Sequence, residues 1–259
     1  MALPVTNCVQ KEGDGCQIVF VHAVGLDLGW WSEVIGALPQ NRGWLAYDLP
    51  AHGLSHPLTG PITLSSLAEH LDEVIDENYS SQPVHLVGLS VGGMIAQVYA
   101  ARKPDDIRTL TLIDTACTLS PAARNAMRKR ADLVLHDGMD AIVEATLDRW
   151  FSPNFRRFRP DIIDRCVKTL LAADPEVHAA MWRAIAELET EKLLKSIRKP
   201  ACVIVGEMDP STPVESARRI VEALPNAQLK IIKEASHLPI IESALQVADA
   251  LMACINLAE

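Results

Sequence analysis

The chain has 259 residues, of which 49% are hydrophobic, so it is long enough to bury one large α/β core with an insertion. Its formal net charge of -9 argues against binding to nucleic acid and to an anionic membrane surface. An anionic small-molecule substrate remains compatible with this charge, because one buried arginine can dominate a pocket. The oligomeric state is left open by the sequence, with a homo-oligomer as one option.

The six cysteines lie far apart and form neither a Cys-x-x-Cys pair nor a Cys/His cluster with zinc spacing, so we expect no metal site. The N-terminal residues lack the basic and apolar regions of a signal peptide, and no apolar run reaches the length of a membrane span. We therefore expect reduced thiols and a cytoplasmic location. Nucleotide-binding glycine motifs are absent, so no cofactor is expected.

The first part of the chain alternates short apolar runs with amphipathic segments, which is typical of a doubly wound, mostly parallel sheet. A weak edge strand is expected at Pro4–Val9. The stronger strands expected here are 18–21, 43–47, 85–87 and 109–113, and the helices are 30–38, 64–78 and 93–102. Ligands bind such sheets beyond the carboxyl ends of the strands, where Ser90 and Asp114 fall.

From residue 118 to residue 197 the chain shows no strand-like run. Helical patterns follow one another there, at 121–135, 139–150, 160–171, 175–187 and 191–197. This segment is too long for an ordinary loop, so we expect a helical cap inserted into the sheet domain. The alternation resumes with strands at 201–205 and 228–232 and helices at 215–224 and 240–255. The predicted core is thus 1–117 with 198–259, and the predicted cap is 118–197.

The sequence Gly88-Leu-Ser-Val-Gly92 follows a strand-like run and opens a helical one. A serine exposed at the end of a strand needs a tight strand-to-helix turn, and small residues two positions away on either side avoid clashes. The pattern therefore predicts Ser90 as a nucleophile. A glycine-rich turn with an incidental serine is the alternative reading.

Nucleophilic serine catalysis also needs a base and an acid that orients the base. Asp209 and His237 follow Ser90 in the chain order Ser, Asp, His, and each comes directly after a predicted strand. We predict that these three residues form a catalytic triad. Asp114, at another strand end, is the rival candidate for the acid.

The negative charge that develops on the substrate oxygen requires two backbone N–H donors. Val91, directly after the serine, is expected to provide one of them. The second should come from the loop after the first buried strand, where Val24 is preferred and Ala23 is the alternative.

The chain resembles the α/β-hydrolase family over nearly its whole length, and within that family it is similar to 3-oxoadipate enol-lactonases. The stretches that carry this resemblance are 24–31, 88–97, 138–142, 149–153, 206–213 and 235–237 with Glu242. The hydrolase motifs are shared by many esterases, whereas the Arg-Trp-Phe stretch from Arg149 is more discriminating. The resemblance implies an α/β-hydrolase fold and hydrolysis of a small enol-lactone that bears a carboxylate.

By this resemblance Arg149 and Trp150 would line the pocket from the cap, and Arg149 would hold the substrate carboxylate. Alternatively, Arg149 is a solvated helix arginine and Trp150 an ordinary core residue of the cap. The sequence departs from the family at His22-Ala23 and in the loop from Asp48 to Gly53. A carboxylesterase, another lactonase or a C–C bond hydrolase with the same triad is therefore the alternative function, and a non-enzymatic binder is a third.

Overall fold

A computed structural model describes residues 5–80 and 82–259. Within these residues, seven strands form one sheet in the order β1-β3-β2-β4-β5-β6-β7. In this sheet of the described residues, the β1–β3 pair is antiparallel and the other pairs are parallel. The strands are β1 Cys8–Lys11, β2 Asp14–Val21, β3 Arg42–Tyr47, β4 Val84–Leu89, β5 Ile107–Ile113, β6 Ala201–Gly206 and β7 Ala227–Ile232. The predicted mostly parallel, doubly wound sheet is confirmed. The edge strand expected at Pro4–Val9 begins only at Cys8, and Pro4 lies outside the described residues.

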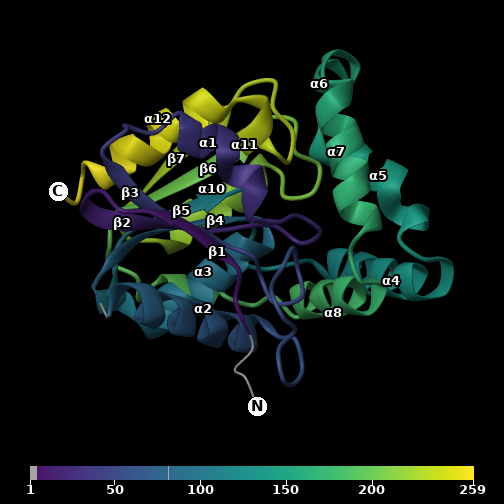
Figure 1. Ribbon diagram of the computed structural model, residues 1–259, viewed down its shortest axis with the longest axis horizontal. Coiled ribbons are helices and arrows are strands. Elements are labelled where there is room, and N and C mark those ends of the chain that lie inside the picture. Colours follow the sequence, from purple (N-terminus) through teal and green to yellow (C-terminus); the bar gives the residue numbers. More distant parts are fainter. Residues whose placement is uncertain (1–4, 81) are drawn as a thin grey trace.

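Helices cover both faces of the sheet, because alternate residues of each buried strand feed two separate apolar clusters. Val19 of β2 packs into the cluster beneath α2 (Leu64–Tyr79), α3 (Val91–Arg102) and α10 (Val214–Ala223). Phe20 packs into the cluster beneath α1 (Ser32–Gly36) and α12 (Ala244–Ile255). Figure 1 shows α1 and α12 on one side of the strands and α2 and α3 on the other. Burial on both faces explains why these strands are continuous apolar runs.

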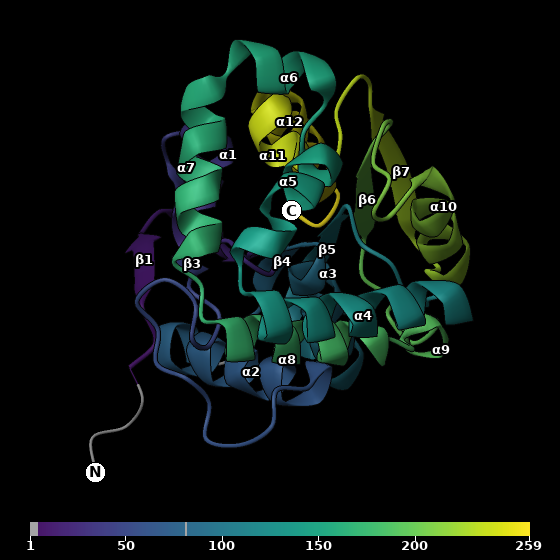
Figure 2. The same ribbon diagram turned by 90° about the vertical axis from the view of Figure 1, so that its right-hand side faces the viewer.

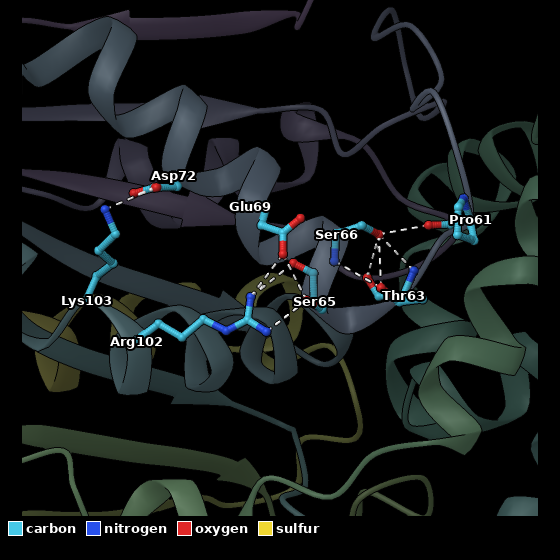
Figure 3. A network of polar contacts seen from close by, with 8 residues as sticks. All are labelled: Pro61, Thr63, Ser65, Ser66, Glu69, Asp72, Arg102 and Lys103. Atoms are coloured by element: carbon cyan, nitrogen blue, oxygen red, sulfur yellow. Dashed lines mark hydrogen bonds and ion pairs between the residues drawn. The ribbon is translucent and has the colours of Figure 1, made fainter.

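Helix α2 follows the prediction closely, since it begins at Leu64 and ends at Tyr79. The Thr63 and Ser66 side chains form a capping box at its start. Figure 3 shows this cap beside two links near the surface from α2 to the C-terminal end of α3. Arg102 reaches Ser65 and Glu69, and the ammonium of Lys103, the residue after α3, lies 3.2 Å from the Asp72 carboxylate. Exposed pairs of this kind contribute little to stability.

Two predicted helical stretches are divided in the structure, and one further helix was not predicted. The stretch after β2 divides into a 3-10 helix at Leu28–Trp31 and α1. The closing stretch divides at Ser243 into α11 (Pro239–Glu242) and α12. A short helix at Pro153–Phe158, α6, was not predicted; Ser152 caps it by accepting from the Phe155 N–H.

Residues between β5 and β6 form consecutive helices with no strand in this stretch. They are α4 Pro121–Asp137, α5 Asp140–Trp150, α6, α7 Pro160–Leu171, α8 Pro175–Ala186 and α9 Glu191–Leu194. Helices α4 and α8 lie side by side, and α5, α6 and α7 continue along the same side of the molecule (Figure 2). An isolated bridge between Thr118 and Glu189 joins the two ends of this segment. We propose that 118–197 acts as a cap on the core 1–117 and 198–259.

Candidate active site

Ser90 stands in a strained turn between β4 and α3. Its backbone has φ 54° and ψ -117°, a conformation that side-chain-bearing residues rarely adopt. A Cβ added to Gly88 would lie 2.4 Å from the Gly92 carbonyl oxygen, and one added to Gly92 would lie 2.2 Å from the Val21 oxygen. No residue larger than glycine fits at either position without movement of the backbone. The geometry therefore agrees with the prediction that Gly88 and Gly92 are needed to avoid clashes around the serine turn.

The structure brings Ser90, His237 and Asp209 together. The His237 Nδ1 atom lies 2.8 Å from Asp209 Oδ2, and its Nε2 atom lies 3.1 Å from Ser90 Oγ. A Cβ on Gly206 would lie 2.0 Å from the Ser236 carbonyl oxygen, so this glycine allows the two loops that carry the aspartate and the histidine to meet. In the tautomer that fits, Nδ1–H donates to the carboxylate and Nε2 accepts from the serine hydroxyl.

The carboxylate of Asp209 is held by donors from its own loop as well as by His237. The Ser211 N–H and the Thr212 hydroxyl each donate to it at 2.7 Å. Burial alone would favour the neutral acid, but attraction to His237 and the hydrogen bonds from His237 and Thr212 lower the pKa of Asp209 to about 2. Asp209 is therefore ionised at neutral pH and can stabilise a positive charge on the histidine.

Asp114, the rival acid, occupies a different place. Its Oδ1 atom accepts from the Gly206 N–H at 2.8 Å, and the hydrogen bond from His237 goes to Asp209 instead. Side-chain ligand atoms of Asp114, Asp209 and His237 lie within 4.8 Å of one another. Both imidazole nitrogens of His237 already have protein partners, so this group does not offer the free donor set of a metal site.

The predicted oxyanion donors lie on two adjacent segments. Val91 is the first residue of α3, where backbone N–H groups have no acceptor within the helix. Val24 follows β2, and the contact of Gly92 with the Val21 carbonyl brings the two segments together. The oxyanion role of Val24 and Val91 stays a prediction.

His22 fixes the course of the loop that carries Val24. Its Nε2 atom accepts from the Leu49 N–H at 2.8 Å, so Nδ1 carries the proton that is donated to the Ala23 oxygen, also at 2.8 Å. Burial, aided by repulsion from His52, lowers the pKa of His22 to about 3. The imidazole therefore stays neutral, and its two hydrogen bonds hold this loop in place.

The histidine loop is tied to the helical segment by hydrogen bonds that the sequence did not reveal. Glu242 accepts from the Ser152 hydroxyl at 2.5 Å and from the Ser236 N–H at 3.0 Å. The Ser236 hydroxyl donates to the Arg149 carbonyl at 2.9 Å, and the Leu238 N–H donates to the Trp150 carbonyl at 3.1 Å. Arg149 and Trp150 therefore adjoin His237 through their backbones.

The side chains of these two residues differ in their surroundings. The Trp150 ring is buried in an apolar cluster, in agreement with the core alternative. The Arg149 side chain is half-buried and donates to the Thr146 hydroxyl at 3.1 Å. Burial lowers the pKa of Arg149, and Asp148 opposes this effect. Asp148 is itself paired with Arg156.

A second half-buried guanidinium, that of Arg130, lies 4.3 Å from the centre of the Trp182 ring. Burial, together with repulsion from Arg149, lowers the pKa of Arg130 to about 10. Within residues 5–80 and 82–259, neither Arg130 nor Arg149 forms an ion pair with a carboxylate. The sequence alone does not single out Arg130, because residues 118–197 contain many arginines.

This sheet order, the strained serine turn and the serine–histidine–aspartate contact define an α/β hydrolase. The profile of the alpha/beta hydrolase family matches residues 18–250, and the chain belongs to this family. The predicted α/β-hydrolase fold and the resemblance to enol-lactonases are both confirmed.

Several relatives cover most of the chain. A 3-oxoadipate enol-lactonase of Acinetobacter baylyi is 27% identical over 89% of this chain and 85% of its own length. A pimeloyl-[acyl-carrier protein] methyl ester esterase of Chromobacterium violaceum is 27% identical over 90% of this chain and 91% of its own. The enol-lactonase structure from Burkholderia xenovorans has a TM-score of 0.89 and 25% identity, covering 98% of this chain and 97% of that one.

A malate-bound thermophilic esterase from Thermogutta terrifontis gives a TM-score of 0.90 with 27% identity, covering 98% of this chain and 94% of that one. The relatives thus include both esterases and enol-lactonases. None of the helices within the described residues is long and apolar enough to cross a membrane.

Proposed function

We propose that the protein is a serine hydrolase that opens a small, carboxylate-bearing enol-lactone of the 3-oxoadipate enol-lactone type. The observation that carries this proposal is the 3.1 Å contact between Ser90 Oγ and a histidine held by an ionised aspartate. The half-buried Arg149, beside the histidine loop and without a carboxylate partner among the described residues, supports an anionic substrate.

The proposed reaction has two stages and needs no cofactor. His237 takes the proton of the Ser90 hydroxyl, and Ser90 Oγ bonds to the lactone carbonyl carbon while the Val24 and Val91 N–H groups stabilise the oxyanion. The ring C–O bond then breaks, and His237 returns the proton to the departing enol oxygen. His237 next takes a proton from water, and the water oxygen bonds to the acyl carbon. The bond from that carbon to Ser90 Oγ then breaks, His237 returns the proton to Ser90 Oγ, the carboxylic acid is released, and the enol tautomerises to the ketone.

The relatives support this substrate class and also an alternative. Two 3-oxoadipate enol-lactonases of Acinetobacter baylyi, each 27% identical, and a related esterase described with bound malate favour a small anionic ligand. The methyl ester esterase at the same identity favours a carboxylesterase that uses the same triad. Other lactonases and C–C bond hydrolases remain within this alternative.

The substrate proposal predicts a selective effect of Arg149→Ala. We expect KM for 3-oxoadipate enol-lactone to rise about 10-fold or more, because the variant loses a charge-assisted hydrogen bond to the substrate carboxylate. Hydrolysis of p-nitrophenyl acetate, which is neutral, should stay near the wild-type rate. Steady-state kinetics on both substrates measures the difference.

Arg128→Ala is the matched control for this experiment, because Arg128 is an exposed arginine of the same segment that pairs with Glu187. It should leave both activities unchanged. Hydrolysis of the neutral ester alone, with equal rates for wild type and Arg149→Ala, would favour the carboxylesterase and reject the anionic lactone.

We further propose that the protein acts in the cytoplasm on a small-molecule substrate, without nucleic acid or a membrane as partner. All six cysteines are unpaired, which fits a reducing compartment. A homo-oligomer remains compatible with this proposal.

A further inference from the structure

Two buried carboxyl groups meet behind His237. The exposed fraction of Asp114 is 1% and that of Asp209 is 4%, and their ligand atoms fall within the 4.8 Å group that includes His237. Two ionised carboxylates this close and this deeply buried repel each other strongly, so one of them retains a proton.

The hydrogen-bond donors around Asp114 and Asp209 decide which of the two carboxyl groups retains the proton. Asp209 accepts from Ser211, Thr212 and His237. The Oδ1 atom of Asp114 accepts from Gly206, whereas its buried Oδ2 atom receives no hydrogen bond from the donors of the described residues. A negative oxygen without a donor is costly inside a protein, whereas a protonated Oδ2 becomes a donor beside the acceptor oxygens of Asp209.

The charges that face Asp114 lead to the same assignment. Asp209 follows β6, His237 precedes α11, and Glu242 lies on α11. Burial raises the pKa of Asp114 well above its ordinary value, and the negative charges of Asp209 and Glu242 raise it further, while the Gly206 N–H opposes them. Burial also raises the pKa of Glu242, while hydrogen bonds from Ser152 and Ser236 oppose this effect.

The backbone around Asp114 is fixed to both neighbours of the site. Its N–H donates to the Ile204 oxygen of β6 at 2.9 Å, and its φ of 41° lies in the left-handed region that aspartate and asparagine tolerate. On the other side, the Ser90 N–H donates to the Ile113 oxygen at 2.9 Å, and the Thr115 hydroxyl donates to the Ser90 oxygen at 2.7 Å. Asp114 therefore lies between the serine turn and the aspartate loop.

We propose that Asp114 is a neutral carboxylic acid whose Oδ2–H donates to Asp209 and positions that carboxylate for His237. The inference rests on the proposed triad. Asp114 is a positioning residue, since it acts on the histidine only through Asp209. Among the described residues, its neutral state leaves Asp209 as the negative charge that His237 contacts directly.

Infrared difference spectroscopy of wild type against Asp114→Asn tests the protonation state without substrate. Asparagine suits the backbone conformation, can accept from Gly206 and can donate to Asp209. At neutral pH we expect the wild type to show a protonated carboxyl C=O band that is lost in the variant. Loss of ionised carboxylate bands instead would overturn the proposal. Because no turnover is involved, this result is independent of whether the proposed reaction is correct.

The pH profile of kcat/KM for p-nitrophenyl acetate provides the second readout. Asp114→Asn should keep the acidic limb in place, because it replaces one neutral donor by another. If Asp114 were ionised, its removal would shift that limb to lower pH by about 1 unit or more. Asp114→Leu, which cannot donate, should lower kcat about 10-fold or more with KM unchanged. Wild-type kcat in a folded Asp114→Leu variant would contradict the positioning role.

Discussion

Replacing Ser90 by alanine should reduce kcat by about 10^6-fold, which is the scale seen when a triad loses its nucleophile. The physical reason is that the variant has no oxygen able to form the acyl-enzyme, while its binding surface and oxyanion donors remain. KM should change little for the same reason. The measurement is steady-state hydrolysis of p-nitrophenyl acetate and of 3-oxoadipate enol-lactone, with enzyme purified free of host esterases.

Ser55→Ala is a matched control, because Ser55 and Ser90 have the same exposed fraction of 8%. The Ser55 hydroxyl donates to the Asp48 oxygen in a loop that contributes no residue to the proposed triad. This control should retain activity within a few-fold of the wild type. Activity of Ser90→Ala at a comparable level would exclude the serine mechanism.

Replacing Asp209 by asparagine should reduce kcat by about 10^4-fold. The amide that replaces the carboxylate can present an N–H to His237 Nδ1, which favours the tautomer that cannot accept the serine proton. It also removes the negative charge that stabilises the protonated histidine. Kinetics on both substrates checks the loss, and circular dichroism establishes that the variant is folded.

The low pKa of Asp209 adds a condition to this prediction. Because the pKa of Asp209 lies at about 2, protonation of Asp209 cannot cause a loss of wild-type activity at any pH above about 3.

Thr212→Val provides a milder test of Asp209, since it removes one hydroxyl donor from the carboxylate and leaves its charge. A smaller loss is expected there than in Asp209→Asn. Equal activity of wild type and Asp209→Asn would contradict the assignment of Asp209 as the acid.

Much of the fold was predictable, because both faces of the sheet are covered. A strand such as β4, buried along its whole length, is apolar except at His85, whose Nδ1 atom is hydrogen-bonded to the Thr109 hydroxyl, and a short apolar run bounded by turns reveals it. The serine turn was predictable for a steric reason: Gly88 and Gly92 are forced by contacts with neighbouring backbone. The chain order of the serine, aspartate and histidine then indicated which loops meet.

Other features depend on contacts between segments that are far apart in the sequence, and no local sequence pattern indicates such contacts. The break at Ser243 separates two helices whose residues read as one apolar stretch, and α6 is too short to show a helical period. Glu242 was noted only as part of the family resemblance, and no local pattern shows that it joins Ser152 to Ser236 across the chain. The choice between Asp114 and Asp209 likewise required the position of the His237 ring.

Treatment with a serine-directed fluorophosphonate, followed by intact-mass and peptide mass spectrometry, tests the mechanism most directly. The compound reacts with a serine whose hydroxyl is activated by a neighbouring base. We predict a single adduct on Ser90 in the wild type, no adduct in Ser90→Ala and strongly slowed labelling in Asp209→Asn. An unlabelled wild-type protein, or an adduct on a serine other than Ser90, would contradict the proposal that Ser90 is the nucleophile.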